Sequence, residues 1–258
     1  MNDHGTAYYL YCLAPGSPAL ALREADVFVR VWDEIAVVLS EARREEFCGA
    51  AAEERLQDLA WLAPRACRHE AVVEQVMRQS SVLPARFATL FGSLDSLERF
   101  VGQHRCAIHE FFTRFGGQQE WAVKGLLDRT LASRPAQPAD LSGELLPGQR
   151  YLRNKRVQAE ARQEMNLRLQ AACQEAARLL EQQSSAFREL KVWMGTGSEA
   201  PAEVILNWAF LLRPAAEQDF RQRVKELDQR HSASGLSFTF SGPWPPYSFA
   251  PVLEAGTP

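Results

Sequence analysis

The sequence predicts an α+β protein of two domains, and three observations support this. The chain has 258 residues, 46% of them hydrophobic, which is enough for two domains that each bury a core. The hydrophobic pattern alternates between short extended runs and helical spacing. A glycine pair at residues 116 and 117 follows the last helical pattern of the first half. We therefore expect one domain over residues 1–116 and another over residues 117–258.

The first half combines extended and helical segments. Apolar, aromatic residues 6–14 predict a buried strand, and Asp33 and Glu34 separate two β-branched runs as in an antiparallel hairpin. Helical spacing follows from residue 50, and Pro64 is expected to separate two helices there. The remaining elements expected are an extended segment over residues 81–91 and a helix over residues 93–115.

The second half has a more specific order of elements. We expect strands over residues 119–128, 187–194, 204–212 and 236–240, and helices over residues 151–183 and 214–231. This β-α-β-β-α-β order matches the ferredoxin-like fold, an antiparallel sheet with two helices on one face. The first helix is longer than a small domain can cover, so we expect one end to project or to contact the other domain.

Composition argues against several functional classes. The 29 basic and 32 acidic residues are nearly balanced, which is not expected of a nucleic-acid-binding protein. The sequence has neither a signal-peptide pattern nor an apolar run of membrane-spanning length, so a cytoplasmic protein without membrane contact is expected. The five cysteines contain no Cys-x-x-Cys pair, which favours reduced thiols and no metal site.

Motifs that carry chemistry are also missing from the sequence. The segment GTGSEA lacks the lysine and serine that complete a phosphate-binding loop, and it is typical of a hairpin turn. No nucleophile elbow or zinc-protease motif is present, and His69-Glu70 is more simply explained by helix capping and packing. We therefore predict no catalytic residue, no cofactor and no enzymatic activity.

Two candidate recognition surfaces remain. The first consists of four cations where the long helix begins, namely Arg150, Arg153, Lys155 and Arg156. A helix N-terminus favours negative charge, so these residues are either a solvated face or a docking surface for an acidic partner.

The second candidate surface is the C-terminal segment SGPWPPYSF. Its prolines, Pro243, Pro245 and Pro246, are expected to end the last strand and to hold the chain in a rigid path. Trp244 and Tyr247 then either close the core as a plug against the second domain's sheet and long helix, or form an exposed partner-binding strip.

A structural role is expected for Arg86 and Phe87 in the segment VLPARFATLF. An arginine in an extended apolar segment is expected to be held by a carboxylate or by carbonyls. Arg86 is therefore expected to support the fold rather than to bind a partner.

Several stretches together resemble the gas vesicle synthesis protein GvpF/GvpL family. They are YYLYCL, HEAVVEQVM, VLPARFATLF, EWAVKGLLD, LPGQRYLRNKR and SGPWPPYSF, in the family's order from about Tyr8 to Phe249. One departure is Ala88, where members usually have glycine.

The resemblance implies a two-domain protein with a ferredoxin-like second domain. It also implies a non-enzymatic accessory or minor structural component of gas vesicles, which are hollow protein shells. The implied partners are the major shell protein and other gas vesicle accessory proteins. Apart from the resemblance, a small-molecule-sensing regulatory protein that uses the ferredoxin-like sheet is the alternative.

Overall fold

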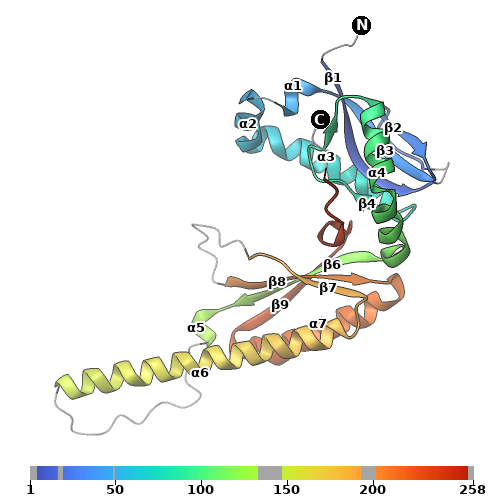
Figure 1. Ribbon diagram of the computed structural model, residues 1–258. Helices are drawn as coiled ribbons and strands as arrows, with labels where there is room; N and C mark the ends of the chain where they lie inside the picture. Colours follow the sequence, from blue (N-terminus) through green and yellow to red (C-terminus); the bar gives the residue numbers. More distant parts are fainter. Residues whose placement is uncertain (1–4, 17–19, 49, 133–146, 193–201, 255–258) are drawn as a thin grey trace. The chain divides into compact units, whose positions relative to one another are not determined.

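The computed structural model of the protein divides into two compact units (Figure 1). It describes residues 5–16, 20–48, 50–132, 147–192 and 202–254. One unit comprises Met1–Glu120 together with Pro243–Pro258, and the other comprises Trp121–Gly242. Both units combine a sheet with helices, so the mixed α and β character that we expected is confirmed for each of them.

The first unit is built on a five-stranded sheet. Its strands are β1 (Thr6–Pro15), β2 (Val27–Trp32), β3 (Ile35–Arg43), β4 (Leu83–Pro84) and β5 (Leu90–Phe91). The order is β2-β3-β1-β4, with β5 also paired to β1. The predicted hairpin between β2 and β3 is confirmed, and Asp33 and Glu34 at its turn both have positive φ angles.

Both faces of this sheet are covered by helices. The helices are α1 (Arg44–Phe47), α2 (Ala50–Gln57), α3 (Leu59–Met77) and α4 (Leu94–Phe115). Ile35, Val37 and Leu39 of β3 pack in the core that contains α4, whereas Ala36 and Val38 pack in the core that contains α3. Alternate residues of a strand face opposite sides, so a strand covered on both sides is apolar throughout.

The expected helix break at Pro64 is wrong, because Pro64 lies inside α3. The break falls six residues earlier, where the Asp58 side chain accepts a hydrogen bond from the Ala60 amide and caps α3. Near the proline, the Arg65 side chain donates to the Trp61 carbonyl at 3.1 Å. The proline itself removes the amide donor that would reach the Ala60 carbonyl, four residues earlier.

The second unit is built on a four-stranded sheet in the order β7-β8-β6-β9. Its strands are β6 (Gln119–Leu127), β7 (Ala186–Glu189), β8 (Glu203–Leu212) and β9 (Leu236–Trp244). The main helices are α6 (Pro147–Glu181) and α7 (Glu217–His231), and short helical turns α5 (Arg129–Ala132), η1 (Pro214–Ala216) and η2 (Ser232–Ser234) complete the unit. Figure 1 shows α6 and α7 on the same side of this sheet. The segment GTGSEA lies outside the described residues.

The last strand is longer than predicted and includes Pro243. We expected it to end at residue 240, since proline cannot donate to a sheet. However, β9 is an edge strand, and at an edge a missing amide donor can be tolerated.

The C-terminal segment corrects the predicted domain boundary. We assigned it to the second domain, but residues 243–258 group with the first unit. The helical turn η3 (Tyr247–Phe249) contains Phe249, whose ring is buried and lies 6.0 Å from the Phe115 ring. Ala250 and Leu253 also pack on the core beside α4, so apolar burial places the segment in this unit.

Candidate functional site

The first candidate site is an aromatic cluster that joins four segments of the first unit. Tyr9 comes from β1, His69 from α3, Phe87 from the loop after β4, and Tyr247 from η3. The His69 ring lies 5.6 Å from Tyr9, 5.9 Å from Phe87 and 6.4 Å from Tyr247, measured between ring centroids. All four residues lie within stretches that carry the family resemblance, so these distant motifs converge in space.

The hydrogen bonds of this cluster fix the tautomer of His69. Its Nε2 lies 3.2 Å from the Ala85 carbonyl, which can only accept, so Nε2 carries the proton. Its Nδ1 then accepts from the Tyr9 hydroxyl at 2.9 Å. The Tyr9 oxygen in turn accepts from the Ala88 amide at 3.1 Å. These hydrogen bonds therefore connect Ala85, in the loop after β4, to α3 and β1, and then return to the same loop at Ala88.

Burial sets the protonation of these groups. It lowers the pKa of His69 to about 4, although the bond to Ala85 acts in the opposite direction. Burial also raises the pKa of Tyr9 far above its usual value. Both groups are neutral near pH 7, which agrees with the directions of the hydrogen bonds. His69 is thus a structural imidazole, and packing explains its position better than an acid–base role does.

Two carboxylates of the first unit hold the C-terminal segment. Oε2 of Glu70 accepts a hydrogen bond from the Tyr247 hydroxyl at 3.0 Å. The buried carboxylate of Glu120 accepts from the Ser248 amide at 2.8 Å and from the Ser248 hydroxyl at 2.6 Å. Burial raises the pKa of Glu70, and the bond from Tyr247 opposes that rise. Glu70 stands out in the sequence beside His69, but no local pattern indicates a partner 177 positions away.

The C-terminal segment is partly buried, although not in the domain where we expected it. Pro245, Pro246 and Phe249 are buried in the first unit, while Trp244 is exposed. The expectation that the segment closes the second domain is wrong. Phe249 and the prolines, rather than Trp244, supply the apolar contacts.

Arg86 does not have the structural role that we expected from it. Its side chain is exposed and has no partner among the described residues. The backbone of Arg86 is used instead, because its carbonyl accepts from the Thr89 amide at 3.2 Å and from the Thr89 hydroxyl at 2.7 Å. Ala88 has φ +62°, and the tight turn that results directs the Arg86 side chain to solvent. Phe87 packs in the cluster, as its structural role requires.

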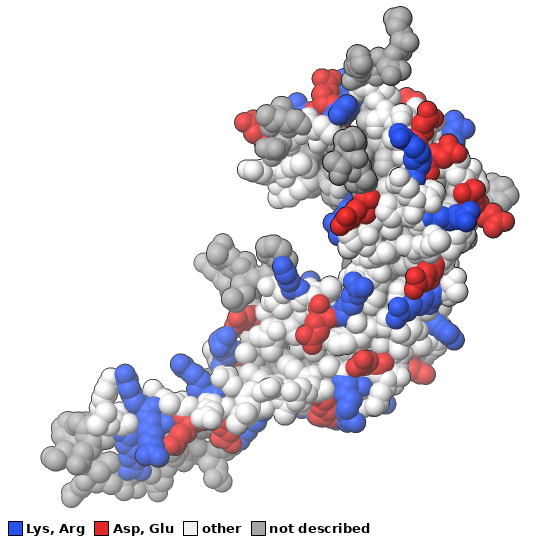
Figure 2. All heavy atoms as spheres, viewed as in Figure 1, with Lys and Arg blue, Asp and Glu red and all other residues white. Residues whose placement is uncertain are grey.

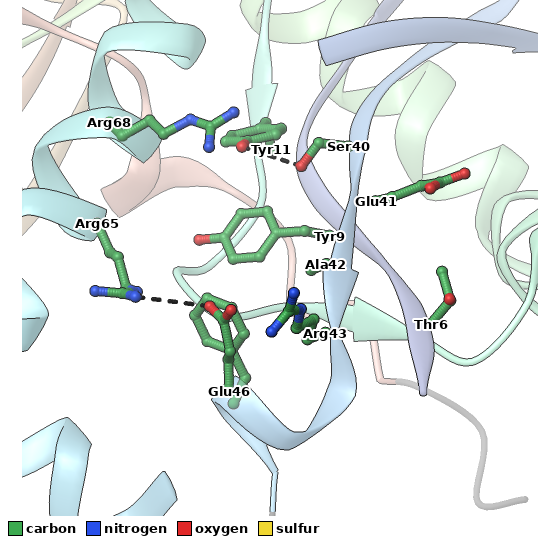
Figure 3. Close-up of a pocket in the computed structure, with 11 residues that line it drawn as sticks. Thr6, Tyr9, Tyr11, Ser40, Glu41, Ala42, Arg43, Glu46, Arg65 and Arg68 are labelled. Carbon is green, nitrogen blue, oxygen red and sulfur yellow. Dashed lines mark hydrogen bonds and ion pairs between the residues drawn. The ribbon is translucent and has the colours of Figure 1, made fainter. Parts of the chain in front are cut away.

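A hollow of about 420 Å³ lies beside this cluster, between α3 and the sheet. Figure 3 shows Arg65 and Arg68 on α3 facing Tyr9 and Tyr11 of β1. The Tyr11 hydroxyl lies 3.2 Å from Oγ of Ser40 on β3. No local pattern in the sequence predicts this hollow. The available signal was the spacing of Tyr9 and Tyr11, which places two polar hydroxyls on one face of a buried strand.

The second candidate site is the exposed part of α6, in the other unit. Side chains from residue 151 to 164 are exposed on every side of the helix. Arg153, Lys155 and Arg156 are all exposed there, and Figure 2 shows Lys and Arg gathered on this part of the surface. Arg150 lies in α6, but its side chain is outside the described part of the structure. Tyr151 and Leu152 are large apolar residues exposed among these cations.

Within the described residues, no group of three His, Cys, Asp or Glu side chains could hold a metal ion. None of the described helices combines the length and the apolar character that a membrane crossing requires.

Comparison with known proteins identifies the family. The family model of the gas vesicle synthesis protein GvpL/GvpF matches residues 7–251. The chain belongs to this family. This match confirms the resemblance found in the sequence. The family is one of gas vesicle synthesis proteins, so the chain is a gas vesicle protein.

Relatives match over nearly the whole chain. Gas vesicle protein L of Streptomyces sp. (strain CB03234) is 27% identical over 93% of this chain and 85% of its own length. Gas vesicle protein F of Dolichospermum flosaquae is 26% identical over 94% of this chain and 96% of its own.

Solved structures show the same fold. The crystal structure of GvpF from Anabaena sp. PCC7120 has a TM-score of 0.67 at 20% identity, covering 96% of this chain and 97% of that one. The GvpF structure from Microcystis aeruginosa also has a TM-score of 0.67, at 21% identity over 95% and 99% of the two chains.

Proposed function

We propose that this GvpL/GvpF family member is a non-enzymatic accessory or minor structural protein of gas vesicle assembly. It binds the major shell protein and other gas vesicle accessory proteins, and it acts in the cytoplasm in association with the vesicle. The observation that carries this proposal is the exposed part of α6. This helix presents cations and large apolar side chains to solvent together, which is typical of a protein-binding surface.

The apolar stripe of α6 supports this use. Ala176 and Leu180 are buried in the core of the second unit, and Leu169 packs against the same core. Toward the N-terminus, the same helical spacing continues through Val157, which is exposed. A helix that keeps an apolar stripe beyond its own core has a face that a partner can cover. The cations around it favour a partner with an acidic surface.

We also propose that the second unit is ferredoxin-like. Its main elements follow the order β6-α6-β7-β8-α7-β9, and the sheet order β7-β8-β6-β9 places the first and third strands of the unit side by side. This is the arrangement of the split βαβ motif. The fold by itself gives no function.

Co-expression with the major shell protein tests the proposed role. We expect the shell protein to be recovered in larger soluble amounts with this chain than without it, because a bound partner shields apolar surface. A variant with both Arg153→Glu and Lys155→Glu should lose this effect at unchanged stability, since both side chains are exposed. High salt should weaken binding in the same way.

The matched control reverses two exposed cations elsewhere in the second unit, Arg213→Glu and Lys225→Glu. It makes the same change in net charge without touching α6, so recovery of the shell protein should equal that of the wild type. Equal recovery with and without the wild-type chain would refute the proposed role. Equal recovery with the α6 variant and the wild type would refute only the role of this surface.

The alternative is a small-molecule-sensing protein. The sequence suggested the ferredoxin-like sheet for that purpose, but the observation that favours a ligand is the hollow in the first unit. A thermal-shift screen against metabolites separates the two roles, because a ligand that binds the folded state raises its melting temperature.

A further inference from the structure

The hollow beside α3 is lined by a pair of hydroxyls from largely buried residues. Tyr11 and Ser40 are each only 3% exposed, and their hydroxyl oxygens lie 3.2 Å apart. One of the two protons forms this bond. The other has no acceptor among the described residues.

Both hydroxyls remain donors at neutral pH. Burial raises the pKa of Tyr11, and the charge of Arg68 only partly opposes that rise. The phenol therefore keeps its proton. Whichever of the two hydroxyls donates to the other, the second can donate into the hollow that both of them line. The hydroxyl pair thus offers one donor to a group bound in the hollow.

Three arginines add N–H donors to the same walls. Arg43, Arg65 and Arg68 line the hollow together with two carboxylates, Glu41 and Glu46, so the lining has three positive and two negative charges. Arg68 donates through Nη2 to Asp26 at 2.6 Å, and Nη2 of Arg65 lies 3.6 Å from Glu46. A guanidinium has five N–H donors, so these contacts leave donors on both arginines.

The charge around the hollow disfavours an anion with two charges. Asp26, which pairs with Arg68, brings the arginines and the carboxylates around the hollow into balance, so Glu41 and Glu46 would repel a phosphate dianion more than a carboxylate. The rings of Tyr9 and Phe47 supply apolar wall for the rest of the ligand. A volume of about 420 Å³ lies within the usual range for small-ligand sites.

We propose that this hollow binds a carboxylate with a short apolar body. One carboxylate oxygen accepts from the Tyr11–Ser40 hydroxyl pair, and the other accepts from an N–H of Arg68 that does not face Asp26. The carboxylate is supplied either by a free small acid or by an acidic side chain of a peptide. This site is separate from the exposed part of α6, so it does not depend on the proposed gas vesicle role.

Calorimetric titration of the full chain tests this inference with three probes at fixed ionic strength. The probes are sodium benzoate, an acetylated and amidated Gly-Phe-Glu-Gly peptide, and inorganic phosphate. We expect saturable binding of benzoate or the peptide, and at least tenfold weaker binding of phosphate. Benzoate alone would indicate a free acid as ligand, and tighter binding of the peptide would indicate a protein side chain.

Variants show whether binding occurs in the hollow. Ser40→Ala and Arg68→Gln should each weaken binding at least tenfold. Arg105→Gln is the matched control, because Arg105 also pairs with an aspartate in the first unit but does not line the hollow. Tyr11→Phe provides a second test of the hydroxyl pair if Ser40→Ala does not fold. Absence of saturable carboxylate binding, equally tight phosphate binding, or wild-type affinity in Arg68→Gln and the folded hydroxyl variant would overturn the proposal.

Discussion

The Tyr247 hydroxyl donates a hydrogen bond to Oε2 of Glu70 at 3.0 Å, across 177 positions of the chain. Glu70 lies in α3 and Tyr247 in the C-terminal segment, so the bond fastens the end of the chain to a helix of the first unit. Two of the sequence stretches that carry the family resemblance are thereby in direct contact. Their joint occurrence in the sequence has a physical reason, because Tyr247 supplies a hydrogen-bond donor to Glu70.

Tyr247→Phe should destabilise the first unit. The variant keeps the ring but removes the donor to a half-buried carboxylate, and the loss of such a partner costs about 1–3 kcal/mol. Urea denaturation measures the free energy of unfolding. Tyr151→Phe is the control, since Tyr151 is exposed in α6 and its hydroxyl should contribute less than about 0.5 kcal/mol. Equal midpoints for both variants and the wild type would show that the bond to Glu70 is not stabilising.

Acid should destabilise the first unit through His69. Its pKa is lowered from 6.5 to about 4 by burial, so between these pH values the unfolded chain binds more protons than the folded one. The stabilising contribution is complete above pH 6.5 and is lost as the pH falls toward 4. The loss amounts to about 3 kcal/mol, and denaturation at a series of pH values measures it.

His69→Gln separates this effect from other acid-sensitive groups. The variant has no titrating imidazole, so the loss of stability between pH 6.5 and 4 should be smaller than in the wild type. Glu70 acts in the opposite direction, because its raised pKa favours proton binding by the folded state. Parallel pH profiles of the wild type and His69→Gln would show that the imidazole titrates normally.

Ala88→Gly should stabilise the first unit. Ala88 has φ +62°, a left-handed conformation that costs a residue with a Cβ atom about 1–2 kcal/mol. Glycine avoids this cost but loses more entropy on folding, so we expect a net gain of up to about 1 kcal/mol. Ala85→Gly is the matched control, because Ala85 is not among the residues with positive φ. It should lose stability, and the same loss at Ala88 would contradict this account.

Local pattern predicted most of the elements but not their long-range placement. The hairpin at Asp33 and Glu34 and the order of elements in the second unit follow from periodicity and turn residues, and the structure contains them. The location of the C-terminal segment depends on contacts such as that between Phe115 and Phe249, and no local pattern encodes these contacts. Ala88 departs from the glycine that family members usually have, and its positive φ angle explains why glycine suits this position.

The candidate sites were predictable only in part. The cations of α6 stand next to one another in the sequence, so they could be identified, whereas the hollow needs Tyr11, Ser40 and Arg68 from three separate elements. Arg86 was misjudged because an extended apolar segment usually implies burial, and the turn at Ala88 could not be seen in the sequence.

Two leucines of α6 should differ sharply in their contribution to stability. Leu180 is fully buried in the core of the second unit, and Leu180→Ala should cost about 2–5 kcal/mol. Leu152 is 68% exposed, so Leu152→Ala should change stability by less than about 0.5 kcal/mol. In shell-protein binding we expect the reverse, so Leu152→Ala should weaken binding more than Leu180→Ala does. A large loss of stability in Leu152→Ala would mean that this part of α6 is already covered within the protein.

Point variants in the C-terminal segment test whether the burial of its side chains stabilises the first unit. Phe249 is 4% exposed, and Phe249→Ala should cost about 3–5 kcal/mol. Val252 is 67% exposed, and Val252→Ala should have almost no effect on the unfolding midpoint. Similar midpoints for the two variants would contradict burial as the cause.

Deletion of every residue after Gly242 should destabilise the first unit selectively. The deletion removes the buried Phe249 ring and the donors that Tyr247 and Ser248 supply to Glu70 and Glu120. Loss of one large apolar side chain and two carboxylate partners should cost several kcal/mol, a large share of the stability of one domain. The core of the second unit contains none of the deleted residues. Hydrogen exchange should therefore accelerate in β1 and α3 while β8 remains protected. Unchanged exchange in β1 and α3, together with lost binding of gas vesicle partners, would instead identify the segment as a binding strip.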